Sequence, residues 1–207
     1  LAASFLKAVR LVLLVTCPLY LGLSVAAPDF VAVVLGSKWQ AMAPLMTILA
    51  FAMPAQTLHI LFTPAINATG HVRITARTSL LGALIMPAAF LIGLHWGATG
   101  LAYAWLLAFP VLPLFTFVQA RGTLSLTARQ LAAAIAPGLL ASGAMALAVL
   151  TLARAVPLAA AWQRLGLEIG FGAVCYAALL LAFSRAALLE LVGLVLRRRR
   201  TMPAAAA

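Results

Sequence analysis

The stretch LAAAIAPGLLASGAMALAVLTLA, from Leu131 to Ala153, runs for 23 residues without one charged side chain. About 20 apolar residues in a helix are enough to cross the hydrocarbon core of a bilayer. Lipid offers no hydrogen-bond partners, so a segment in that core must satisfy its own backbone, as a helix does. This stretch therefore predicts a membrane-spanning α-helix.

The rest of the chain has the same character. Of its 207 residues, 66% are hydrophobic and 8% are charged, and the mean hydropathy is +1.15. A water-soluble domain is much more polar than this. A transmembrane barrel would need short alternating strands, whereas this chain has long unbroken apolar runs. The sequence therefore predicts an all-α fold, a polytopic bundle of transmembrane helices.

Polar, glycine and proline residues divide the bundle, residues 1–183, into six predicted spans. They cover about residues 11–27, 41–66, 78–96, 101–120, 131–153 and 165–183. Pro28 and Asp29 are expected to end the first span, and Pro54 and Pro64 predict a kink or break in the second. Residues 184–200 are too charged to span, so we expect a basic amphipathic helix on the membrane surface, followed by a disordered tail at 201–207. Because the chain opens on leucine, we also expect a fragment that lacks an N-terminal half.

The net charge of +11 has two explanations, nucleic acid and membrane topology. The basic residues lie at the edges of the apolar runs, which favours topology and excludes nucleic acid as the expected partner. Across the six spans, one side receives 11 of the lysines and arginines and the other receives three: Lys38, Arg154 and Arg164. The positive-inside rule then places both termini in the cytoplasm.

Signatures of catalysis and metal binding are missing from the sequence. Asp29, Glu168 and Glu190 are the only acids, and the three histidines form no zinc-binding pattern. Cys17 and Cys175 lie inside apolar runs without ligand spacing. We therefore expect no enzyme activity, no metal and no cofactor.

Candidate substrate contacts are the polar side chains within or beside the spans. Gln56, His59 and Asn67 have spacings that place them near one face of a continuous helix, where they could line a polar cavity. Alternatively, they satisfy backbone groups freed by the prolines. Arg73 and Arg77 are four residues apart and could bind a diphosphate, or they could be interfacial anchors.

Two further patterns allow more than one interpretation. Arg164 and Glu168 are expected to form an interfacial ion pair, although Glu168 could instead couple transport to an ion. Small residues recur every fourth position at Gly138, Ser142 and Ala146, at Gly166 and Gly170, and at Gly93 and Gly97. Such faces let membrane helices approach closely.

A resemblance to a known family lies in three motifs. They are CPLYLGLSVAAPDFVAVVLGSKW at residues 17–39, APLMTIL at 43–49 and WGATGLAYAW at 96–105. Over about residues 11–120 the chain resembles the C-terminal half of Wzx-type flippases for lipopolysaccharide and exopolysaccharide repeat units. These flippases belong to the multidrug/oligosaccharidyl-lipid/polysaccharide (MATE/MOP) exporter superfamily.

The resemblance implies a transporter of two helix bundles that opens alternately to each side of the membrane. Its substrate would be an oligosaccharide linked to undecaprenyl diphosphate, and its partners would be membrane lipid and the missing N-terminal half. Two alternatives remain open: a drug/cation antiporter of the same superfamily, or a non-transporting scaffold of a polysaccharide-synthesis complex. A membrane-bound acyltransferase is disfavoured because no catalytic histidine/acid pair is evident.

Overall fold

The computed structural model describes residues 2–156 and 160–183, and this part of the chain is helical with no β-strand. Seven α-helices follow one another, some joined by short 3₁₀ or π segments. The α-helices are α1 (Ala2–Phe30), α2 (Ala43–Asn67), α3 (Val72–Gly93), α4 (Gly97–Ala108), α5 (Val111–Thr123), α6 (Ala128–Ala155) and α7 (Ala161–Phe183). The all-α prediction is confirmed for the described residues.

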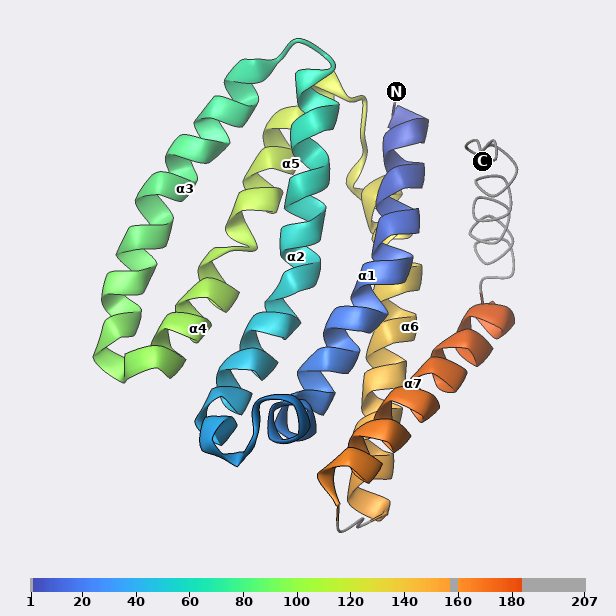
Figure 1. Ribbon diagram of the computed structural model, residues 1–207. Coiled ribbons are helices and arrows are strands. Elements are labelled where there is room, and N and C mark those ends of the chain that lie inside the picture. The colour runs from blue at the N-terminus through green and yellow to red at the C-terminus, as the bar shows by residue number, and fades with distance from the viewer. Residues whose placement is uncertain (1, 157–159, 184–207) are drawn as a thin grey trace, which may run out of the picture.

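The helices run up and down as a bundle with α1 near its centre (Figure 1). Helix α1 packs against α2, α6 and α7, while α3 folds back onto α4 as an outer hairpin beside α2. Gly97, with φ of 66°, turns the chain between α3 and α4. That backbone angle suits glycine because it has no Cβ.

The first helix does not end where the sequence predicts. Helix α1 continues through Pro28 and Asp29 to Phe30 and then widens into a π-helical turn, Val31–Leu35. The Gly36 N–H donates to the Val31 carbonyl at 3.0 Å and closes this turn. A proline removes one backbone hydrogen bond, whereas ending a helix leaves several backbone N–H and C=O groups without partners. In lipid this difference favours a helix that continues through the proline.

Prolines also act differently in the second and fourth predicted spans. Helix α2 is continuous through Pro54 and Pro64, so the predicted break there is wrong. The chain is interrupted instead at Phe109 and Pro110, between α4 and α5. Pro110 cannot donate to the carbonyl four residues earlier, and Pro113 follows within one turn.

Five helical runs of the described chain are long and apolar enough to cross a membrane. One of them, Val72–Thr123, contains the α3–α4 reversal. The lengths of α4 and α5 are 12 and 13 residues, too short for either to cross alone. The chain is thus a multi-pass membrane protein, and the count of six spans stays a prediction. The predicted surface helix and tail lie outside the described residues.

A buried apolar cluster closes the end of the bundle where α1 begins. It draws on α1, α2, α3, α5, α6 and the α5–α6 connection, and comprises Phe5, Val9, Leu13, Cys17, Phe62, Ile66, Ile74, Ala120, Leu124, Leu126, Leu131 and Ala134. Large apolar side chains also cover the outside: Leu107 is 74% exposed and Leu140 is 71% exposed. A protein surface of this kind suits lipid rather than water.

The described cations divide between the two ends of the bundle. The start of α1, the α2–α3 turn and the α5–α6 connection lie together at one end (Figure 1), and the apolar cluster joins them. This cation-rich end carries Lys7, Arg10, Arg73, Arg77, Arg121 and Arg129, while the opposite end carries Lys38, Arg154 and Arg164. The fold therefore groups these cations as the loop-by-loop prediction does.

Candidate functional site

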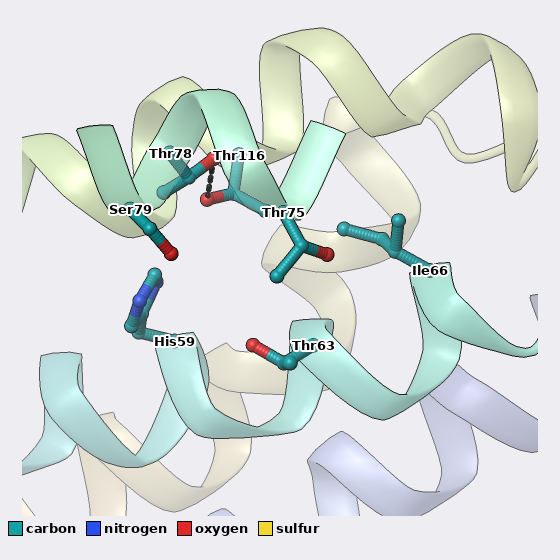
Figure 2. A pocket seen from close by; sticks show the side chains of 7 residues that line it. All are labelled: His59, Thr63, Ile66, Thr75, Thr78, Ser79 and Thr116. Atoms are coloured by element: carbon teal, nitrogen blue, oxygen red, sulfur yellow. Dashed lines mark hydrogen bonds between the residues drawn. The ribbon is translucent and has the colours of Figure 1, made fainter. Parts of the chain in front are cut away.

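A small polar cavity lies between α2, α3 and α5. Its volume is about 20 Å³, enough for about one water molecule. Figure 2 shows His59 and Thr63 of α2 facing Thr75 and Ser79 of α3 across this space. The full lining is His59, Thr63, Ile66, Thr75, Thr78, Ser79 and Thr116. A cluster of hydroxyls inside an apolar bundle marks this cavity as a candidate site.

Threonine hydroxyls fix the wall formed by α3 and α5. Thr116 Oγ1 lies 3.2 Å from Thr78 Oγ1 and 2.8 Å from the Leu112 carbonyl oxygen. Thr78 in turn donates to the Ile74 carbonyl at 3.1 Å. Both threonines are 3% exposed. Their hydrogen bonds satisfy buried polar groups and hold the two helices in register.

His59 is the ionisable residue of this cavity. Its Nδ1 is buried and has no hydrogen-bond partner among the described residues. The ring packs edge-on against Phe109, with 5.6 Å between centroids, at the interruption between α4 and α5. An unpaired buried nitrogen is costly unless water or a ligand binds it. The cavity beside His59 has room for such a water.

The other polar residues predicted on α2 do not join His59 in lining the cavity. Gln56 lies one turn earlier on α2, and its buried Oε1 likewise has no partner among the described residues. Asn67 is exposed at the end of α2 and accepts a hydrogen bond from Thr75 at 3.0 Å. Asn67 therefore connects α2 to α3. A substrate role for these residues stays a prediction.

Arg73 and Arg77 lie in the first two turns of α3 and are both exposed at the cation-rich end. Neither lines the cavity. The beginning of a helix carries partial positive charge, so two arginines there do not stabilise the helix dipole. Their position instead suits an anion, either a lipid head group or a substrate phosphate.

A second polar cluster lies at the opposite end, where α1 meets α7. Arg164 donates from Nε and Nη2 to Oδ1 of Asp29, at 2.9 and 2.7 Å. The sequence predicted Glu168 as the partner of Arg164, whereas the structure shows an ion pair with Asp29, an acid that the fold brings from α1. Glu168 lies one turn farther along α7, is 7% exposed, and has a buried Oε2 without a hydrogen-bond partner among the described residues.

Sequence reasoning missed the hydroxyl lining and the Asp29 contact. The segment Ile74 to Ser79 carries Thr75, Thr78 and Ser79 at helical spacing, which was a readable signal for a polar helix face. Nothing local linked Asp29 to Arg164, since 135 residues separate them. Only tertiary packing joins these two side chains.

Comparison with known proteins gives one match. Residues 1–44 match a family described as polysaccharide biosynthesis protein. These residues form α1, the π and 3₁₀ turns and the first residues of α2. No curated protein and no solved structure matches the chain. The match covers only the N-terminal part of a multi-pass membrane protein, and it links that part to polysaccharide biosynthesis.

Proposed function

We propose that this chain is part of a transporter that moves lipid-linked oligosaccharide repeat units across a bacterial inner membrane, for lipopolysaccharide or exopolysaccharide synthesis. The observation that carries the proposal is the match of residues 1–44 to a polysaccharide biosynthesis family, within a bundle of apolar helices. The lipid carrier would be undecaprenyl diphosphate. A second helix bundle would complete the translocation path, and the chain itself would catalyse no reaction.

The cation-rich end supports this cargo. A diphosphate needs positive charge where it enters, and Arg73 and Arg77 offer two guanidinium groups one turn apart on exposed helix. Arginine binds phosphate through paired N–H groups. By the positive-inside rule this end would be cytoplasmic, which is the side where lipid-linked repeat units would be loaded.

The polar cavity supports a path that opens during transport. At about 20 Å³ it is too small for a sugar in the present arrangement. Helices α3 and α5 would therefore have to separate from α2, exposing His59 and the surrounding hydroxyls. The interruption at Phe109 and Pro110 lies beside His59 and is a suitable hinge. Hydroxyl and imidazole groups would then replace water around the passing sugar.

The first prediction tests the role of the arginines. Changing Arg77 to alanine should lower export of repeat units by about 10- to 100-fold, because a charge-assisted contact to phosphate is worth about 1.5–3 kcal/mol. The protein would be expressed in a strain that lacks its own flippase for a matched glycan, and surface polysaccharide would be measured. Arg73→Ala should have a similar effect.

Arg154→Ala is the matched control, because Arg154 is exposed at the opposite end of the bundle. It is preferable to an Arg164 variant, which would also remove the contact with Asp29. Equal export by the Arg77 and Arg154 variants, at equal amounts of inserted protein, would contradict the proposed phosphate contact. Failure of the unaltered protein to restore any glycan would contradict the transporter itself.

A drug/cation antiporter of the same superfamily is the second candidate. The buried Glu168 favours it, since an acid inside a membrane bundle suits ion coupling. Drug resistance without restored polysaccharide in the same strain would select this alternative.

A further inference from the structure

The contact between α1 and α7 contains the only two carboxylic side chains of residues 2–156 and 160–183, Asp29 and Glu168. Asp29 belongs to the last turn of α1, and Glu168 to the second turn of α7. Arg164, one turn before Glu168, joins them. Two acids and one base therefore meet where two helices distant in sequence come together.

Asp29 and Arg164 form an ion pair of defined geometry. The Nε and Nη2 groups of Arg164 donate to the same carboxylate oxygen of Asp29, Oδ1. The Asp29 side chain is 13% exposed. Oδ2 takes no part in these two bonds. These two hydrogen bonds of Arg164 thus both go to Asp29.

Glu168 is the acid that lies outside this ion pair. It is 7% exposed, and its Oε2 has no hydrogen bond within the described chain. Asp29 and Arg164 both act on it electrostatically. With both acids ionised, the three side chains carry a net charge of −1, and Glu168 is the most buried of them. Burial disfavours the charged form of a carboxyl group, and uptake of one proton removes that charge.

The other charged and titratable groups near α7 do not neutralise Glu168. Helix α6 carries Arg154 near its exposed end, and the π turn Val31–Leu35 carries none. Along α1, Tyr20 and Cys17 lie two or more turns before Asp29. A metal ion is a poor alternative, because no group of three or more potential ligands occurs in the described ranges and Arg164 already occupies Asp29 Oδ1.

We propose that Asp29, Arg164 and Glu168 form a proton-binding site between α1 and α7, in which Glu168 takes up one proton from solution beside the ion pair of Asp29 and Arg164. Loss of the proton leaves a carboxylate one helical turn from Arg164, and this carboxylate competes with Asp29 for the guanidinium. The ion pair that connects α1 to α7 is therefore strongest when Glu168 is protonated. This site does not depend on the identity of the cargo.

Infrared difference spectroscopy on the protein in lipid nanodiscs tests the proposal directly. The carbonyl stretch of a protonated carboxyl should be present at about pH 6. Glu168→Gln should abolish that band, while the matched control Glu190→Gln should retain it. A band absent at this pH, or unchanged in Glu168→Gln, would overturn the proposal.

The Asp29→Asn variant tests whether Asp29 influences proton binding by Glu168 or only connects α1 to α7. Without the Asp29 charge, Glu168 becomes the carboxylate partner of Arg164, so its titration should move to lower pH. An unchanged titration in a folded Asp29→Asn protein would contradict the shared site. Repeating the wild-type measurement with sodium at constant pH tests the ligand: loss of the band on adding sodium would show a site for monovalent metal ions and overturn the assignment to the proton.

Discussion

At the scale of single residues, the close approach of α1 and α6 depends on Gly138. A Cβ at this position would lie 3.1 Å from the backbone carbon and oxygen of Leu13. Ser142, one turn later, is fully buried and donates to the Gly138 carbonyl at 2.6 Å. The predicted small-residue face of this helix is confirmed at these two positions, which let the helix backbones meet.

Gly138→Ala should therefore destabilise the protein. The added methyl meets backbone rather than a flexible side chain, so we expect a loss of about 1–3 kcal/mol in the free energy of unfolding. Gly143→Ala is the matched control on the same helix, since a Cβ there would have nothing within 4 Å. Thermal unfolding in detergent would compare the two variants. Equal unfolding temperatures would show that α1 can move away at little cost.

The same spacing of small residues on α7 does not mark a close helix contact, and the reason is not visible in the local sequence. Gly166 and Gly170 have nothing within 4 Å of a Cβ at either position. Spacing alone marks a face as small, but the rotation of the helix in the bundle decides which face meets a neighbour. Within the described residues the predicted close packing at these glycines is wrong.

At the scale of elements, helix α6 has a defined beginning. The Gln130 N–H donates to the Thr127 hydroxyl at 3.2 Å, and the Thr127 N–H donates to Gln130 Oε1 at 3.0 Å. This reciprocal arrangement is a capping box, which satisfies two backbone donors that the helix leaves free. It fixes the start of the helix at the cation-rich end of the bundle.

Thr127→Ala should lower the stability of α6 by about 1 kcal/mol, because the Gln130 N–H then loses its acceptor. Faster amide hydrogen exchange at Gln130, whose N–H the Thr127 hydroxyl accepts, would report the loss. Thr151→Ala serves as control, because its hydroxyl bonds the Ala148 carbonyl inside the same helix. Exchange at the first turn that is identical in both variants would show that the cap does not hold this end.

The helix boundaries show that a proline in the sequence does not by itself predict an interrupted helix. Pro18, Pro28, Pro54, Pro64, Pro87 and Pro137 all lie inside continuous helices. The interruption at Pro110 is accompanied by Pro113, so two donors are lost within one turn. A single proline removes one backbone bond, which a membrane helix tolerates. The sequence shows where a helix lacks a backbone hydrogen bond, and the packing of the bundle decides at which of these positions the helix is interrupted.

At the scale of the whole molecule, the arrangement of the helices predicts which connections lie on the same side of the membrane. The α2–α3 turn and the start of α6 lie at one end of the bundle, while the π and 3₁₀ turns and the α3–α4 reversal lie at the other (Figure 1). The pair α4–α5 connects the two ends. If both ends emerge from the membrane, α4 and α5 cross it together, which gives the predicted sixth span.

Single cysteines at exposed positions should label according to this arrangement. In a protein with Cys17 and Cys175 changed to alanine, Ala68→Cys and Ala128→Cys should react with an impermeant maleimide from one side. Ser37→Cys and Ala98→Cys should react from the other side. Labelling of residues 98 and 128 from the same side would contradict a crossing by α4–α5, and labelling of residue 68 from outside the cell would contradict the positive-inside assignment.

Sequence by itself determined the membrane environment, the helical class and the division of the cations between two ends. These properties follow from hydropathy and loop charge, which act through the solvent and need no partner residue. Tertiary structure alone decided that Asp29 reaches Arg164 and that threonines of α3 and α5 line the cavity beside His59. It also decided that Gly166 and Gly170 of α7 have no close neighbour among residues 2–156 and 160–183. Such contacts depend on how the helices rotate and cross, and spacing within one helix carries no information about its neighbours.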